Sequence, residues 1–189
     1  GALNSNNLQS SLNSFFSAIS GVLNQPESVS VRNLAVLQGK TLAGDINQMS
    51  QRVSSARSDL NDQIVGMTSD INRLVSDIAK LNAEISSTEG GDTSHSQAVG
   101  LRDQRNQDLT NLSKLVGIRT QEQPSGAVNV YVGGDYLVFE GTSRTVETAY
   151  TVDRGLTAAH INLTDTNAPL DTQTGQLAGL LASRDKILG

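Results

Sequence analysis

The chain has 189 residues, a net charge of −5 and no cysteine. The acidic balance argues against a general nucleic-acid binder, which needs a basic face, and the lack of cysteine excludes disulfides, thiolate metal sites and cysteine nucleophiles. Only 37% of the residues are hydrophobic and six are aromatic, whereas Ser, Thr, Asn and Gln together supply 65. We therefore expect a narrow core, in which each helix contributes one apolar stripe.

The first predicted element is a helix over residues 8–23. Its apolar residues recur at steps of three and four, which places them on one helical face, and Pro26 follows the pattern. No stretch approaches the roughly 20 apolar residues of a membrane span, and no cleavable signal peptide is visible. We interpret the chain as a fragment of a longer protein.

A second, much longer helix is predicted over residues 28–88. Its apolar positions recur every 3.6 residues on average, about one helical turn, and form a heptad-like seam with one stutter. Gly39, Gly44 and Gly66 weaken this helix by about 0.8–1 kcal/mol each. We predict that the seam packs against other helices; its residues are Leu42, Ile46, Met49, Val53, Leu60, Ile64, Met67, Ile71, Leu74, Ile78, Leu81 and Ile85.

A row of charged residues with largely alternating signs lies beside this seam. Neighbours in the row are three or four residues apart, so they can form ion pairs along the helix worth about 0.2–0.5 kcal/mol each. Such a row is either a solvated face or a surface turned toward a neighbouring subunit. The residues of the charged row are Asp70, Arg73, Asp77, Lys80 and Glu84.

A third helix is predicted over residues 96–116, after a break at Gly90 and Gly91. Arg105 falls where this helix should present an apolar residue. We expect the stem of Arg105 to pack in the interface while its guanidinium reaches a carboxylate on the long helix. The third helix should fold back antiparallel on the long one.

The periodicity changes to two at residue 126, which is typical of strands. Residues 126–132 and 136–139 form a hairpin pattern around Gly133 and Gly134, further strands are expected at 145–152 and 158–163, and helical spacing returns from Gly175.

The predicted fold is mainly α: an elongated antiparallel helical bundle built on one very long helix, with a small antiparallel β module before the last helix. We expect a helical bundle over residues 1–118, the β module over 119–172, and a return helix over 173–189 that packs on the bundle.

No residues are arranged for catalysis, for a cofactor or for a metal ion. The two histidines, His95 and His160, lack metal-ligand spacing, and no nucleophile-elbow motif is present. The few aromatic residues leave little to line a small-molecule pocket. These observations favour a structural part of a larger assembly over an enzyme.

An ordered series of segments resembles the flagellar hook-associated protein 1 family, which joins the hook to the filament. The resemblance covers nearly the whole chain, and residues 101–106 vary the family's Leu-Asp-Gln-Arg-Asp box at Arg102 and Asn106. The segments are LNSFF at 12–16, NQPES at 24–28, DINRLVSDIAKLNAEI at 70–85, LRDQRN at 101–106, VNVYVGG at 128–134 and GQLAGLLASRD at 175–185.

The resemblance implies an extracellular protein of the bacterial flagellum, secreted through the flagellar export apparatus. It implies as partners further copies of itself in a junction ring, the hook protein and the next junction protein, and an export chaperone that binds a terminal segment. From the residues themselves we also expect no cofactor, no nucleic-acid partner and no membrane. The terminal helices that drive assembly in the family are absent here, so we expect the chain alone to be monomeric and its surface to be open to antibodies.

Two other interpretations remain at this point. One is the signalling coiled-coil stalk of a chemoreceptor, which the β module opposes because such stalks are uninterrupted helical hairpins. The other is a secreted helical adhesin or type III translocator.

Overall fold

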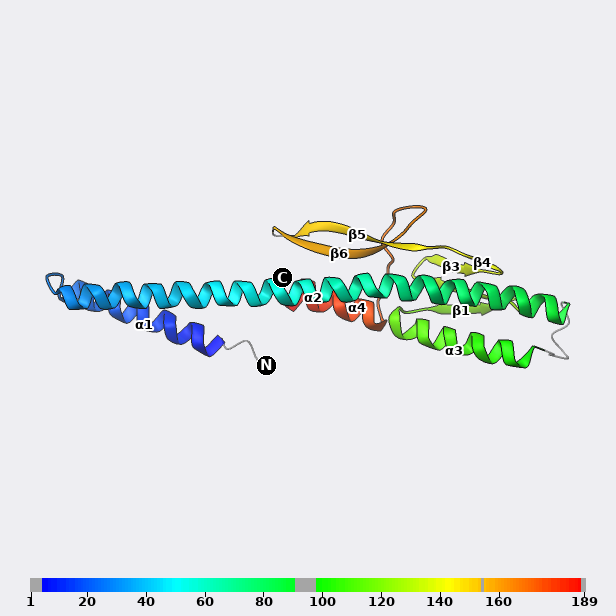
Figure 1. Ribbon diagram of the computed structural model, residues 1–189, viewed down its shortest axis with the longest axis horizontal. Helices are drawn as coiled ribbons and strands as arrows, with labels where there is room; N and C mark the ends of the chain where they lie inside the picture. The colour runs from blue at the N-terminus through cyan, green and yellow to red at the C-terminus, as the bar shows by residue number, and fades with distance from the viewer. Residues whose placement is uncertain (1–4, 91–97, 154, 188–189) are drawn as a thin grey trace. The chain divides into compact units, whose positions relative to one another are not determined.

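The structure is a computed structural model that describes residues 5–90, 98–153 and 155–187; His95 lies outside them. The chain forms two compact units, residues 1–56 and 57–189. Its helices and strands are labelled in Figure 1. They are α1 (Ser5–Asn24), α2 (Val29–Glu89), α3 (Val99–Leu115), β1 (Arg119–Glu122), β2 (Val128–Val132), β3 (Asp135–Phe139), β4 (Thr142–Ser143), β5 (Val146–Asp153), β6 (Leu156–Leu163), α4 (Gly175–Ala182) and the π-helical turn η2 (Ser183–Ile187).

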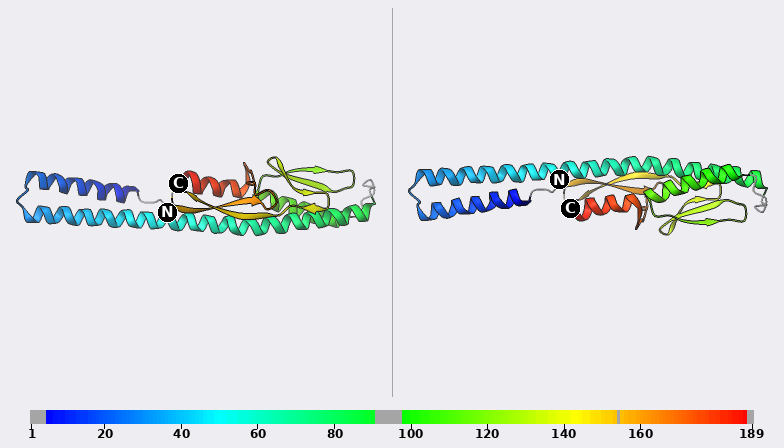
Figure 2. Two further views of the ribbon diagram at one scale, coloured as in Figure 1. Left: turned by 90° about the horizontal axis from the view of Figure 1, so that it is seen from above. Right: turned by 90° about the horizontal axis from the view of Figure 1, so that it is seen from below.

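The first unit is a helical hairpin, in which α1 lies beside the first part of α2 (Figures 1 and 2). The turn between the helices is closed by backbone hydrogen bonds from Gln25 to Gly21 and from Ser28 to Gln25. Small residues let the helices approach closely, since a Cβ at Gly39 would lie 3.2 Å from the ring of Phe15. Among residues 5–56 only two apolar residues are buried, Ala18 and Ala35, so this part of the hairpin has almost no core of its own.

The second unit is built on residues 57–89 of α2. Helices α3 and α4 follow one another along α2 and run antiparallel to it (Figures 1 and 2). The backbone N–H of Gly117 donates to the carbonyl of Thr174 (3.1 Å) and so joins the end of α3 to the start of α4. Gly175 has a φ of +87°, and a Cβ there would lie 2.8 Å from the Leu115 carbonyl oxygen; this contact requires glycine.

The strands form two antiparallel sheets. One has the order β1-β2-β3-β4, with Glu122 opposite Val128 and a register shift between Val130 and Tyr131. The other pairs β5 with β6 along their full length, from Val146 opposite Leu163 to the turn. Strand β2 is central in its sheet and four of its five residues are buried.

Helices and strands of the second unit share one hydrophobic core. Ile71 and Leu74 of α2 pack in the same cluster as Leu112 of α3, Val130 of β2 and Leu163 of β6. The β strands therefore pack on the helices and do not stand apart from them. At about 25 cal/mol per Å² of buried apolar surface, this core is the main source of stability in the unit.

The predicted fold class is confirmed: the chain is mainly helical, is built on one long helix, and carries antiparallel strands before its last helix. Strands β1 and β4 were not expected. Strand β1 reads RTQE and is exposed at every position, so it lacks the alternation that signals a strand. The division at residues 118 and 172 stays a prediction. Among the described residues no helix is long and apolar enough to cross a membrane.

Leu74→Asp should lower the free energy of unfolding of the second unit by more than about 2 kcal/mol, because it places a carboxylate in the core. Leu74 is 2% exposed, whereas Val65 on the same helix is 36% exposed, so Val65→Asp is the matched control and should cost less than about 1 kcal/mol. All three tyrosines lie in residues 57–189, so urea unfolding followed by tyrosine fluorescence reports this unit. Equal losses in the two variants would contradict the buried position of Leu74.

Candidate functional site

The predicted seam on α2 is buried in the second unit and only partly covered in the first. Every seam residue from Ile64 to Ile85 is buried, and Leu60 is half-buried. In the first unit Leu42, Met49 and Val53 are half-buried, while Ile46 is 50% exposed. The difference has a simple cause: in the second unit α3, α4 and the strands surround α2, whereas in the first unit a single helix pairs with it.

The charged row lies on the surface of α2. Arg73 approaches Asp70 (3.5 Å) and Asp77 (3.9 Å), and Lys80 approaches Asp77 (3.8 Å); Glu84 is exposed. These long, solvent-exposed pairs contribute little to stability. Burial and the charge of Asp77 together raise the pKa of Asp108 on α3.

The side chains of three asparagines on α2 form hydrogen bonds with backbone groups of the strands. In each, the side-chain amide donates to a strand carbonyl and its Oδ1 accepts a strand N–H. Asn72 makes both contacts with Val146 (2.8 Å each), and Asn82 makes both with Val128 (2.8 and 3.0 Å). Asn61 binds the Thr157 carbonyl (2.8 Å) and the Ala159 N–H (3.0 Å). Each amide thus takes the place of a neighbouring strand.

These asparagines were not found by sequence analysis, although they leave a signal. Each directly follows a seam residue, and they are spaced 11 and 10 residues apart, about three helical turns. Here the polar residue repeated at that interval lies beside the apolar seam, where α2 contacts both the hydrophobic core and the backbone of the strands.

The buried Arg105 binds an amide on the long helix, where we had expected a carboxylate. Its guanidinium donates to Oδ1 of Asn82 (3.0 Å) and to the Gly126 carbonyl (2.7 Å), and its nearest carboxylate is Glu122 on β1 (3.9 Å). The expected carboxylate partner on the long helix was wrong, because the residue of α2 opposite Arg105 is Asn82 and not an acid. Burial lowers the pKa of Arg105.

Arg102, one turn before Arg105 on α3, binds a carboxylate of the long helix instead, that of Glu89. Arg102 forms a two-pronged ion pair with Glu89 (2.9 and 2.6 Å) and a further hydrogen bond with Glu122 (2.7 Å). These two carboxylates raise the pKa of Arg102. The Glu89 side chain is fully buried, so this pair fastens the end of α2 to α3.

A second polar cluster surrounds Asn61. Arg184 of η2 is fully buried and donates to the Ala159 carbonyl and to Oδ1 of Asn61. Its guanidinium also binds Asp185, which lowers the pKa of that carboxyl. Burial and the nearby Arg184 lower the pKa of His160, which shares a hydrogen bond with Thr151. His160 thus lies in strand β6 and contacts the neighbouring strand β5.

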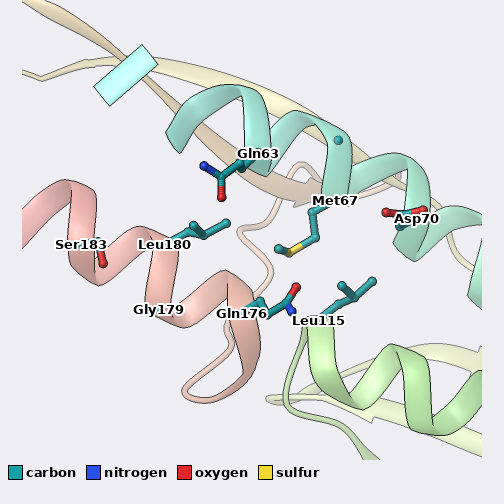
Figure 3. Close-up of a pocket in the computed structure, with 9 residues that line it drawn as sticks. Gln63, Met67, Asp70, Leu115, Gln176, Gly179, Leu180 and Ser183 are labelled. Atoms are coloured by element: carbon teal, nitrogen blue, oxygen red, sulfur yellow. The ribbon is translucent and has the colours of Figure 1, made fainter. Parts of the chain in front are cut away.

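One groove lies between α2, α4 and the end of α3, with a volume of about 580 Å³. Met67 and Leu180 point toward each other across it, with Leu115 nearby (Figure 3). Its only ionisable lining residue is Asp70, the first member of the charged row. No group of three His or acidic side chains within the described ranges could hold a metal ion. The lining of the groove is therefore largely uncharged.

Comparison with known proteins gives a consistent result. Residues 1–189 match the family model described as the flagellar hook-associated protein FlgK helical domain. The chain is 26% identical to flagellar hook-associated protein 1 of Salmonella typhimurium over 97% of its length, and 25% identical to that of Bacillus subtilis over 92%. It covers 34% and 33% of these proteins, about a third of their length.

A solved structure shares the fold. The flagellar hook junction protein FlgK from Burkholderia pseudomallei aligns with a TM-score of 0.76 and 26% identity, over 94% of this chain and 33% of that one. The likeness covers nearly all of the chain.

Asn82→Ala should lower the free energy of unfolding of the second unit by about 2–4 kcal/mol, because it removes the partner of the Val128 N–H and carbonyl and one acceptor of the Arg105 guanidinium. Asn106→Ala on α3 is the control, since Asn106 is exposed and alanine favours helix; it should change stability by less than about 0.5 kcal/mol. Tyrosine fluorescence during urea unfolding measures both. A loss in Asn82→Ala no larger than in the control would show that the amide contacts are weak.

The stability of the second unit should rise with pH between about 5 and 7. The pKa of His160 is lowered below 6.5 in the folded chain, so as pH falls through 6.5 the unfolded chain takes up a proton that the folded chain does not, and stability is lost. His160→Gln should flatten this part of the profile. Urea unfolding at a series of pH values tests it, and parallel profiles for the two proteins would exclude His160 as the titrating group.

Proposed function

The chain belongs to the family of flagellar hook-associated protein FlgK helical domains, and we propose that it is a structural part of the junction between the hook and the filament of a bacterial flagellum. The match of all 189 residues to that family carries the proposal. The structural likeness to a flagellar hook junction protein supports it. Both favour this function over a receptor stalk or an adhesin.

The proposed role is mechanical. The second unit holds α2 by three separate means: a continuous apolar core, three asparagine–backbone contacts and the buried ion pair between Arg102 and Glu89. A helix fixed at several levels resists bending, because any bend breaks hydrogen bonds that water cannot replace in the interior. A junction subunit has to transmit load between neighbouring parts, and this construction suits that task.

The partners we propose are those of an axial flagellar subunit: further copies of the protein in a ring, the hook protein and the next junction protein. We propose that the whole protein leaves the cell through the flagellar export apparatus and that an export chaperone binds one of its termini. The charged row is the proposed polar contact with a neighbouring subunit, since its ion pairs are exposed and weak enough to exchange partners.

Immunogold electron microscopy tests the location directly. Antibodies raised against the 189-residue chain should label isolated flagella of the source cell in a narrow band where hook meets filament. Antibody absorbed beforehand with the purified chain should give no band. Label spread along the filament, confined to the cell body, or absent from flagella would overturn the proposal.

A further inference from the structure

The π-helical turn η2 is held in a different way from the helix that precedes it. Helix α4 is fixed by apolar packing, since Leu177 is 1% exposed and lies in the hydrophobic core. In η2, Arg184 is fully buried, whereas its neighbours Asp185 and Lys186 are exposed. Residues 183–186 contain no apolar side chain. The attachment of this part of the turn therefore depends on polar contacts.

The side chain of Arg184 reaches the edge of strand β6. Its guanidinium donates to the Ala159 carbonyl and to Oδ1 of Asn61 (3.4 Å), and the Asn61 amide binds the Thr157 carbonyl and the Ala159 N–H. The carboxylate of Asp185 accepts two further hydrogen bonds from the same guanidinium (2.6 and 3.1 Å). One side chain thus joins η2 to both α2 and β6. We call these contacts of Arg184 the η2 latch.

The backbone of η2 also departs from the α-helix. Residues 183–187 form a π-helix, a rare conformation that is found mostly as single turns and frequently at functional sites. Arg184, the second residue of this turn, is the one whose side chain enters the interior. Segments that bury little apolar surface open locally while the core of a protein stays folded. The composition of η2 therefore favours a local opening.

A titratable group lies beside the η2 latch. His160 directly follows Ala159 in β6, is half-buried, and shares a hydrogen bond with Thr151 of β5 (3.0 Å). Two charged groups of η2 act on it: Arg184 disfavours a proton on the ring and Asp185 favours one. Burial is the main reason that the pKa of His160 is lowered, and the charge of Arg184 is the second, with a larger effect than Asp185.

Arg57 of α2 is the other basic group of this cluster. It is 2% exposed, pairs with Asp153 at the end of β5 (3.0 Å), and helps to lower the pKa of Asp185. The two arginines and the two carboxylates balance each other while His160 is neutral. A proton on His160 adds an unbalanced positive charge, and a movement of η2 takes Arg184 away from the ring. The open form therefore binds a proton at His160 more readily than the closed form.

From this arrangement we propose that η2 is a pH-sensitive latch: Arg184 holds the turn on the edge of β6, the turn opens locally while α4 and the strands stay folded, and protonation of His160 favours the open form. Opening removes the guanidinium from the Ala159 carbonyl and makes part of the β6 edge accessible. The device is built from contacts within this chain, so it goes beyond the proposed function and does not depend on it.

Amide hydrogen exchange of the whole 189-residue chain, followed residue by residue by NMR, tests the local opening. At neutral pH the amides of residues 184–187 should be protected about tenfold less, or weaker still, than those of residues 179–182 in α4. Exchange in η2 should respond little to low concentrations of urea, because a local opening exposes little surface, whereas exchange in α4 should accelerate with urea.

The same experiment tests the effect of pH. After correction for the intrinsic pH dependence of exchange, protection of residues 184–187 should fall by about twofold or more between pH values of about 7.5 and 5.5, on either side of the usual histidine pKa of about 6.5. The fall is limited to about tenfold per pH unit, since opening takes up a single proton.

Three variants separate the parts of the latch. His160→Gln removes the titrating group and keeps Arg184, so protection of η2 should no longer depend on pH. Arg184→Gln removes the charged donor, so protection of η2 should fall by about tenfold or more at every pH. Lys186→Gln is the matched control: it removes a positive charge from the same turn, but Lys186 is exposed, and protection should remain that of the wild type.

Several results would overturn the proposal. Equal protection and equal urea dependence in η2 and α4 would mean that the two open only together. A pH dependence that persists in His160→Gln would exclude His160 as the titrating group. Unchanged protection in Arg184→Gln, or an equal loss in Lys186→Gln, would exclude the arginine contacts. If circular dichroism shows that Arg184→Gln is unfolded, the wild type and His160→Gln still decide the question, because neither alters a residue of η2.

Discussion

The second unit depends on one kind of contact, an asparagine of α2 that satisfies both an N–H and a carbonyl at the edge of a strand. A helix packed against a sheet edge would otherwise bury backbone groups that its own backbone cannot satisfy. Asn61, Asn72 and Asn82 solve this at three levels, on β6, β5 and β2. The apolar core supplies more energy, but it tolerates small displacements; these directional contacts fix the register between helix and strands.

Two buried arginines complete this arrangement. The Oδ1 atoms of Asn82 and Asn61 each accept a second hydrogen bond, from Arg105 and from Arg184. A guanidinium is costly to bury unless donors find acceptors; Arg105 also donates to the Gly126 carbonyl, and Arg184 to the Ala159 carbonyl and to Asp185. Since each arginine comes from a different element, α3 and η2, the same two asparagines connect helices, strands and the final turn of the chain.

Periodicity was sufficient to predict the helices, the hairpin of β2 and β3, and the seam from Ile64 to Ile85. It could not predict which elements would surround α2, so the equal treatment of Ile46 and Ile64 was misleading: the two residues have the same position in the pattern and opposite exposure. Arg105 was correctly placed in an interface, but its acceptor depends on three-dimensional neighbours. The asparagines were overlooked because a polar residue beside a seam is ordinarily solvent-exposed.

The spacing of the three asparagines has a consequence for how this protein can vary. Each residue inserted into or deleted from α2 turns everything beyond it by about 100° around the helix axis. A change of one residue between Asn61 and Asn82 would direct one amide away from its strand and rotate part of the seam out of the core. Substitutions there can be absorbed one at a time, but changes of length cannot. Evolution of this stretch is thus confined to replacement.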